Sequence, residues 1–346
     1  MNKVNVGIVG LGRLGIQHAE NLAFRIPNCE LKAICGLNTE QLAELSDKWN
    51  IPYTYTSYEE MLQNSELDAI FIASPSNFHC DQIQQALEAG YHVFSEKPLG
   101  LYLEEVEKIE TIINRHQDKV FMLGFMRRYD DSYAYAKKQI EQGAIGEPVM
   151  VRCYGFDPTE GLESFLKFAQ KNYSGGIFLD MAVHDFDLAR WYLGAEAEQV
   201  WAIGGAYSVP AFTELNDAET GAALVKFSNG TMGLFAAGRN SRHGYHIETE
   251  IIGTKGSLRI GTVPEKNAVT IFNDAGALKE CVSNFNERFA QAYLSEVEEF
   301  IHCIQTGNKP TITAKDGVQA SLLGYACKES FETGELVYVK SYSSTK

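Results

Sequence analysis

The first 123 residues alternate short apolar runs with longer segments whose apolar residues recur at helical spacing. Short apolar runs bounded by glycine, proline or polar residues favour buried strands, whereas longer amphipathic segments favour helices. The predicted strands cover 4–9, 31–35, 67–73, 91–94 and 120–123. The predicted helices cover 16–24, 39–49, 58–63, 80–89 and 103–115. Strands that alternate with helices predict an α/β fold with a doubly wound parallel sheet.

After about residue 146 the pattern changes to closely spaced strand-like runs, several of them joined by turns that contain glycine. These runs cover 149–154, 200–204, 221–227, 231–237, 246–252, 257–260 and 268–272, and helical patterns return at 288–305 and 315–332. Such a series is typical of a large, mostly antiparallel open sheet in an α+β domain. We therefore expect a dinucleotide-binding domain over 1–123 and a substrate-binding and oligomerisation domain over 124–346, with C-terminal helices that can pack on either domain.

The composition agrees with a two-domain globular protein and argues against two classes of partner. The chain has 346 residues, 45% of them hydrophobic and 22% charged, and its formal net charge is -15. A nucleic acid partner requires a stripe of lysine and arginine, so the excess of acidic residues argues against one. No uncharged apolar run approaches the roughly 18 residues of a membrane helix, so we expect no membrane partner.

The amino terminus and the cysteines point to a reducing compartment. Met1 to Val4 lead directly into a strand pattern, without the apolar segment and cleavage site of a signal peptide. The seven cysteines are scattered and never spaced as C-x-x-C, so we assign neither zinc nor disulfides. We therefore expect a cytoplasmic protein with reduced thiols.

A glycine-rich loop follows the first predicted strand and precedes the first predicted helix. It contains Gly10, Gly12 and Gly15 in the G-x-G-x-x-G spacing, with Arg13 and Leu14 inside the loop. These glycines supply a tight turn, room for a pyrophosphate and close helix-strand packing, and the helix dipole favours the anion. The spacing alone is a weak signal, but its strand-turn-helix context predicts a Rossmann dinucleotide site.

Two further groups of residues offer proton-transfer chemistry. Lys97 follows the strand-like run 91–94, and ligands of an open parallel sheet bind beyond the carboxyl ends of its strands. For an arbitrary lysine, a surface position at a strand end is the commoner role. Asp180 and His184 would share one face if 177–192 is helical, and a carboxylate that orients an imidazole is a general-base unit. A surface ion pair is the alternative, and the two residues alone fall short of a metal-ligand set.

Taken together, five stretches in this order resemble the Gfo/Idh/MocA oxidoreductase family, over essentially the whole chain. They are Gly10-x-Gly12-x-x-Gly15, Ala73 to His79, Glu96-Lys97-Pro98, Gly124 to Asp130, and Asp180-x-x-x-His184. Within the family, the stretch from Phe125 to Asp130, and Gly244-Tyr245 followed by Glu250 to Gly253, are most similar to the inositol dehydrogenases.

The resemblance implies a role for each matching residue. Lys97, Asp180 and His184 would be catalytic, with His184 accepting the proton of the substrate hydroxyl. The residues that would contact the cofactor are Gly10, Gly12, Arg13, Leu14, Gly15, Ser74, Pro75, Asn77, His79, Glu96 and Lys97. Arg127, Asp157 and Tyr245 would contact substrate hydroxyls, and no metal is implied.

The implied activity is oxidation of one secondary hydroxyl of a cyclic polyol or sugar, chiefly myo- or scyllo-inositol, by NAD. The substrate is then a small molecule, and we expect a homo-oligomer, a dimer or tetramer, formed through the C-terminal sheet. Two rival functions fit the same fold: a non-catalytic dinucleotide sensor, and a glycosidase that borrows NAD within one turnover.

The chain departs from the family pattern at two places. Gly36 stands where an acid usually binds the adenosine ribose, and 37–41 contain no cation, which leaves Arg13 as the nearest positive charge. We therefore expect NAD to be preferred, with measurable NADP activity. The segment 160–173 is longer than in the inositol dehydrogenases, and its Phe165 and Phe168 would form either a lid or a packed helix face.

Overall fold

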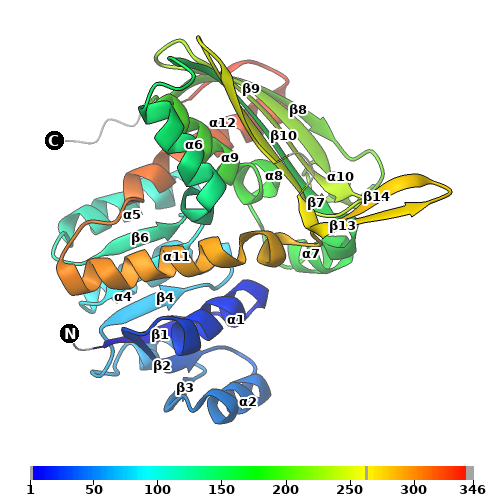
Figure 1. The fold of residues 1–346 in the computed structure, drawn as a ribbon. Coiled ribbons are helices and arrows are strands. Elements are labelled where there is room, and N and C mark those ends of the chain that lie inside the picture. The colour runs from blue at the N-terminus through cyan, green and yellow to red at the C-terminus, as the bar shows by residue number, and fades with distance from the viewer. Residues whose placement is uncertain (1–2, 262–263, 340–346) are drawn as a thin grey trace. The chain divides into compact units, whose positions relative to one another are not determined.

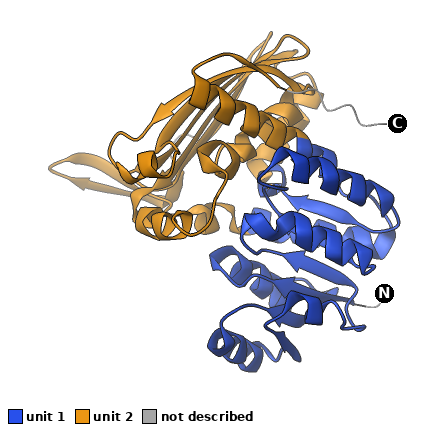
Figure 2. Ribbon diagram, turned by 180° about the vertical axis from the view of Figure 1, so that it is seen from behind, with its two compact units in different colours: residues 1–129, 291–318 blue, residues 130–290, 319–346 orange. Residues whose placement is uncertain are grey.

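A computed structural model describes residues 3–261 and 264–339 of the chain. The chain forms two compact units (Figure 2): unit 1 comprises residues 1–129 and 291–318, and unit 2 comprises residues 130–290 and 319–346. Both units are therefore discontinuous in sequence. The first two residues, on which the expected absence of a signal peptide partly rests, lie outside the described residues.

Unit 1 contains a six-stranded parallel sheet with the strand order β3-β2-β1-β4-β5-β6 (Figure 1). Its strands are β1 (Val4–Val9), β2 (Cys29–Cys35), β3 (Tyr53–Tyr55), β4 (Ala69–Ile72), β5 (His92–Glu96) and β6 (Phe121–Gly124). This order confirms the predicted doubly wound parallel sheet. The sequence analysis did not predict β3, because this three-residue edge strand has no buried residue and therefore no apolar run.

The helices of unit 1 lie on both faces of this sheet. They are α1 (Arg13–Glu20) with a π-helical turn (Asn21–Arg25), α2 (Thr39–Trp49), α3 (Tyr58–Met61), α4 (His79–Glu88), α5 (Leu103–Arg115) and most of α11 (Phe285–Thr306), with 3-10 turns at Ser76–Phe78 and Met126–Tyr129. On one face, Val6 and Ile8 share a core with Val297 and Phe300 of α11. On the other face, a side chain at Gly7 would meet Leu67. Successive residues of β1 thus lie on opposite faces of the sheet.

The contribution of α11 to unit 1 follows one of the two packings that the sequence left open for the C-terminal helices. The apolar side chains of this helix belong to the core of the parallel sheet, so residues 291–318 join unit 1 rather than the second domain. The helix bends at Phe289, whose φ of -116° and ψ of 19° are not helical, next to the point where the chain changes unit. Apolar spacing alone predicts the helix but not the sheet it covers.

Unit 2 is built on a seven-stranded sheet with the order β12-β11-β7-β10-β9-β8-β15. Its strands are β7 (Pro148–Pro158), β8 (Ala197–Gly205), β9 (Thr220–Phe227), β10 (Met232–Ser241), β11 (His246–Gly253), β12 (Ser257–Ile260) and β15 (Val337–Tyr338). Only the central pair β7 and β10 is parallel among the described pairings, which confirms a mostly antiparallel sheet. A separate hairpin consists of β13 (Glu265–Asn273) and β14 (Gly276–Cys281). The sequence analysis did not predict β14, which has no buried residue.

The helices of unit 2 position the residues of the predicted site. They are α6 (Asp131–Glu141), α7 (Leu162–Ala169) after a 3-10 turn (Thr159–Gly161), α8 (Gly176–Asp180), α9 (Val183–Leu193), α10 (Ala211–Glu214) and most of α12 (Ala314–Thr333). Phe186 of α9 packs edge-on against Phe235 of β10, with 5.0 Å between the ring centroids, and so fixes α9 on the sheet. None of the helices in the described ranges is long and apolar enough to cross a membrane.

Candidate active site

Two positions of the glycine loop of unit 1 accept only glycine. Gly10 has a φ of +92°, and a Cβ built there would lie 2.4 Å from the Ser74 amide nitrogen. A Cβ on Gly15 would lie 1.9 Å from the carbonyl oxygen of Gly10. The first glycine therefore makes the tight turn after β1, and the third lets α1 pack against that turn.

Gly12 has the opposite environment, because a Cβ built there meets no atom within 4 Å. Gly12 is exposed and forms the N-cap of α1, whose first-turn amides have no partners within the helix. This open space at a helix N-terminus suits a pyrophosphate, so the predicted loop fits a dinucleotide. Arg13, also exposed, begins the helix at the same place.

The adenosine side of the site lies beyond β2, where Gly36 replaces the usual acid. A Cβ on Gly36 would lie 3.4 Å from the nearest atom of Leu11, an ordinary contact distance. Leu37 is 94% exposed, and the Asn38 side chain is engaged as the N-cap of α2 by accepting from the amides of Glu40 and Gln41. Gly36, Leu37 and Asn38 therefore offer no charged side chain to a 2'-hydroxyl or a 2'-phosphate, and the first acid after them is the exposed Glu40 of α2.

His79 joins two of the predicted cofactor loops from behind. Its Nδ1 lies 2.8 Å from the Pro98 carbonyl oxygen and its Nε2 lies 2.9 Å from the Ser74 carbonyl oxygen, in a fully buried position. Burial lowers the pKa of His79, although the two carbonyls favour its protonated form. The prediction that His79 contacts the cofactor therefore needs correction: it holds the loop after β4 against the loop after β5. Pro75 and Asn77, by contrast, are exposed on the first of these loops.

Lys97 and Glu96 lie at the end of β5 and differ in burial. Lys97 is half-buried, and its peptide bond to Pro98 is cis. The Glu96 carboxylate is turned into unit 1, where its Oε1 lies 2.8 Å from His18 Nε2 and its Oε2 accepts from the Lys97 amide. The prediction that Glu96 touches the nicotinamide is therefore not supported by its hydrogen bonds, which are internal.

In unit 2, Asp180 and His184 belong to two helices rather than one. Asp180 ends α8, and α9 begins at Val183, so the single helix assumed over 177–192 is wrong. At the junction, the amides of both Met181 and Ala182 donate to the Ile177 carbonyl oxygen, which closes the first helix. Asp180 is half-buried, whereas His184 is buried in the first turn of α9. A turn, and not the i, i+4 spacing of one helix, separates the carboxylate from the imidazole.

Arg239 is the main residue that the sequence analysis missed. Its Nη2 donates to Asp180 Oδ2 at 2.6 Å, and its Nη1 lies 3.8 Å from Asp157 Oδ2. The buried guanidinium also lies over the Phe165 ring of α7, 3.6 Å from the ring centroid. Arg239 thus brings a predicted catalytic carboxylate and a predicted substrate contact together, and it explains Phe165 as a packed aromatic rather than a free lid.

Two predicted substrate contacts, Arg127 and Tyr245, are buried, each in its own unit. Tyr245 in unit 2 is 4% exposed, and its ring lies edge-on to Phe289. In unit 1, Arg127 is 3% exposed within the 3-10 turn Met126–Tyr129. Its neighbour Arg128 pairs with Asp316 at 2.9 Å and is therefore structural.

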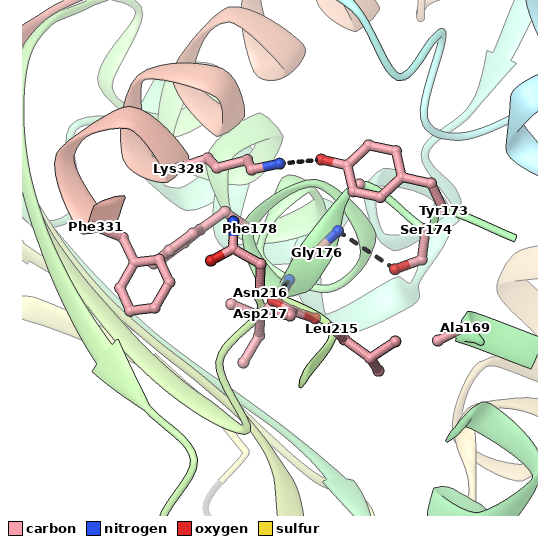
Figure 3. Close-up of a pocket in the computed structure, with 12 residues that line it drawn as sticks. Ala169, Tyr173, Ser174, Gly176, Phe178, Leu215, Asn216, Asp217, Lys328 and Phe331 are labelled. Carbon is pink, nitrogen blue, oxygen red and sulfur yellow. Dashed lines mark hydrogen bonds between the residues drawn. The ribbon is translucent and has the colours of Figure 1, made fainter. Parts of the chain in front are cut away.

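A separate pocket in unit 2 lies beside the start of α8 (Figure 3). It is lined by Gly175, Gly176, Asp217, Lys328 and Phe331 together with residues of the 160–173 segment and its neighbours. Lys328 donates to the Tyr173 hydroxyl at 2.5 Å, and Asp217 accepts from the Ile177 and Ala218 amides. None of the predicted catalytic or substrate residues lines this pocket. Its charged side chains, Lys328 and Asp217, already have hydrogen-bond partners, so this pocket does not replace the predicted site.

Comparison with known proteins identifies the family. The sequence profiles of the oxidoreductase family match residues 4–125 as its NAD-binding Rossmann fold and residues 137–340 as its C-terminal alpha/beta domain. A scyllo-inositol dehydrogenase from Lactobacillus casei, solved with bound NAD(H) and scyllo-inositol, is 46% identical, with a TM-score of 0.95 over 98% of this chain and 100% of that one.

Two further relatives agree. A myo-inositol 2-dehydrogenase structure from Lactobacillus plantarum is 40% identical, with a TM-score of 0.96 over 98% of this chain and 100% of that chain. The scyllo-inositol 2-dehydrogenase (NAD(+)) of Bacillus subtilis is 35% identical over 96% of this chain and 95% of its own length. With both family profiles matched and the glycine loop built for a dinucleotide, this chain is an NAD-binding oxidoreductase of the Gfo/Idh/MocA family.

Proposed function

We propose that the protein oxidises one secondary hydroxyl of an inositol, scyllo- or myo-inositol, to the corresponding ketone with NAD. The observation that carries this proposal is the similarity over nearly the whole chain to a dehydrogenase solved with NAD(H) and scyllo-inositol. The polar groups of unit 2 support it, because Asp157, Asp180 and His184 are hydrogen-bonding side chains suited to a ring of hydroxyls.

The reaction requires that a proton and a hydride leave the same carbinol group. His184 accepts the hydroxyl proton, and Asp180 orients the groups of the site through its fixed position on Arg239. Lys97 stabilises the alkoxide character that develops on the oxygen as the carbonyl forms. Bound NAD supplies the hydride acceptor, and the carbinol carbon becomes a ketone carbon.

Substrate recognition is assigned to Arg127, Asp157 and Tyr245. A site that hydrogen-bonds a hydroxyl discriminates strongly against an analogue that lacks it, because buried polar groups are then left unpaired. Asp157 is half-buried and held near Arg239, so its carboxylate enters the site with a defined orientation.

We also propose that the protein is a homo-oligomer, a dimer or tetramer, formed through the sheet of unit 2. One face of this sheet exposes large apolar side chains on neighbouring strands: Trp201, Ile203, Leu224 and Met232, each at least 40% exposed. Trp201 and Leu224 are cross-strand partners, so these side chains form a continuous patch. A contiguous apolar patch on a sheet face is typical of a subunit interface, and a second copy supplies an identical patch. Light scattering should report a dimer or tetramer that Leu224→Lys converts to monomer.

A cytoplasmic location fits the same proposal, because an NAD-dependent enzyme with seven cysteines and no paired spacing suits a reducing compartment.

The function is tested by incubating the protein with NAD and a panel of inositol isomers, aldohexoses and aryl glycosides. We expect NADH formation with scyllo- or myo-inositol and much slower turnover with acyclic alcohols. Glycoside cleavage without net NADH would indicate the NAD-borrowing hydrolase, and NAD binding without turnover of any compound would indicate the sensor.

A further inference from the structure

A cluster of three titratable side chains lies inside unit 1, behind the residue that precedes Lys97. His18 comes from α1, Glu96 from the end of β5, and Glu296 from α11. His18 and Glu296 have no exposed surface, and Glu96 is 5% exposed. One nitrogen or oxygen atom from each of the three side chains lies within 4.8 Å of the others. The mechanism above uses none of these three groups directly.

The hydrogen bonds within the cluster are unequal. Glu96 has two donors, because its Oε1 lies 2.8 Å from His18 Nε2 and its Oε2 accepts from the Lys97 amide at 3.2 Å. Among the described residues, neither oxygen of Glu296 has a hydrogen-bond partner, and neither does Nδ1 of His18. A carboxylate with two donors is stabilised in its charged form, whereas a buried carboxyl without a donor is stabilised in its neutral form.

The walls of the cluster make a second negative charge unfavourable. The His18 ring packs against Phe71, Phe94 and Tyr293, with centroid distances of 4.7, 5.9 and 5.5 Å. Burial, and then the charge of Glu96, raise the pKa of Glu296 well above its ordinary value. Tyr129 is a titratable group on which Glu296 acts, because burial, and then the charges of Glu299 and Glu296, raise the pKa of Tyr129.

We propose that Glu296 is a positioning residue that holds a proton inside unit 1, so that the cluster carries a single negative charge, placed on Glu96. That charge lies one residue before Lys97, at the carboxyl end of the strand where ligands of this fold bind. His18 Nε2 lies 2.8 Å from Glu96 Oε1 and so fixes the Glu96 carboxylate in place. The inference rests on the proposed function, which assigns Lys97 its role, and deepens it by naming the charge held next to Lys97.

A divalent metal is the competing occupant, since one imidazole and two carboxylates form a ligand set that such ions accept. Three observations favour the proton. His18 Nε2 already lies at hydrogen-bond distance from Glu96, and aromatic rings close the cluster on the side of the imidazole. The described cluster also offers only three protein ligands.

The proton can be observed directly in the cofactor-free protein by infrared spectroscopy. A protonated carboxyl group gives a C=O stretching band that a carboxylate lacks, and we expect such a band at neutral pH. Glu296→Gln should remove it, and Glu110→Gln, a matched change at another buried glutamate of unit 1, should keep it. In Glu96→Gln the band should disappear on titration at a pH lower by about one unit, because the repelling charge is gone.

Kinetics then test the positioning role. Glu296→Ala should lower kcat by about tenfold, and Glu296→Gln, a neutral donor of the same shape, should recover most of that loss. The affinity for NAD should stay within about threefold in both variants, because Glu296 has no part in the glycine loop.

The proposal would be overturned if the wild-type protein lacked the band or if the band persisted in Glu296→Gln. It would also be overturned if calorimetry showed one equivalent of Zn²⁺ or Mn²⁺ that binds the wild type and not Glu296→Gln. A Glu296→Gln variant as slow as Glu296→Ala would contradict the positioning role. The infrared measurement needs no substrate. A protein that shows the band and fails to oxidise inositol would refute the proposed function and leave the proton assignment standing.

Discussion

Replacing Arg239 by methionine should impair catalysis more than it destabilises the fold of unit 2. Methionine keeps most of the side-chain volume, including the contact with the Phe165 ring, but removes the donor to Asp180 at 2.6 Å and the charge near Asp157. Removing one partner of a buried ion pair costs about 3–5 kcal/mol. The Asp180 side chain is 28% exposed, so water replaces part of the interaction, and a loss of about 2–3 kcal/mol in unfolding free energy is expected.

The loss of turnover in Arg239→Met should be larger than the loss of unfolding free energy alone would cause. Asp180 loses the contact that fixes its carboxylate, and a displacement of about 1 Å in such a group lowers turnover by about 10²-fold. Affinity for NAD should change by less than about threefold, because the glycine loop belongs to unit 1. Steady-state kinetics with inositol, together with NAD titration and chemical denaturation, measure the three quantities.

Arg152→Met is the matched control. Arg152 lies on β7 of the same sheet and pairs with Glu248 at 2.8 Å and Glu250 at 3.0 Å, none of which is a predicted site residue. The control should lose stability without a comparable loss of kcat. If Arg239→Met and Arg152→Met lower kcat equally, or if Arg239→Met leaves kcat unchanged, Arg239 has no part in organising the site.

Three further changes test other parts of the structure. His184→Ala should lower kcat by about 10² or more with little change in NAD affinity, and near-normal turnover would remove His184 as the proton acceptor. Gly36→Asp should raise the ratio of kcat/KM for NAD over NADP by about tenfold relative to Gly36→Ala, because a side chain fits there and an acid repels the 2'-phosphate; an unchanged ratio would place the adenosine ribose elsewhere. Although burial acts to raise it, the pKa of Glu219 is lowered by hydrogen bonds from Ser208, Val209 and Asn240. The stabilisation from this ionised carboxylate should therefore be fully present above pH about 4.3 and decline as the pH falls through the lower folded-state pKa. Denaturation of wild type and Glu219→Gln at pH 7 and at lower pH should show the gap between them shrinking on acidification; a constant gap would contradict this assignment.

The sequence predicted most of unit 1 because its local signals agree with its packing. The strand Val4–Val9, the helices Thr39–Trp49 and Leu103–Arg115 and the glycine loop all combine apolar spacing with clear ends. The division of the chain into two units was harder to predict, because the apolar spacing of α11 does not indicate which sheet the helix covers. The edge strand β3 and the exposed strand β14 have no buried pattern to detect.

The site was predicted less completely than the fold. The glycine positions follow from the strand-turn-helix motif, and the structure supports Gly10 and Gly15 by close contacts and Gly12 by open space. Arg239 was missed because it lies 59 residues from Asp180, and no local motif marks an arginine on a strand as the partner of a distant carboxylate. His79 and Glu96 were assigned to the cofactor by their motifs, whereas the structure turns their side chains inward, a direction that spacing in sequence does not reveal.

The central claim is direct hydride transfer from an inositol carbon to NAD, and isotope transfer tests it most directly. The protein should be incubated with NAD and scyllo-inositol that carries deuterium on its ring carbons, and the reduced cofactor analysed by mass spectrometry and NMR. The account predicts monodeuterated NADH with the label at C4 of the nicotinamide, formed together with the ketone. NADH that forms without deuterium, or no NADH from any inositol isomer, would contradict it.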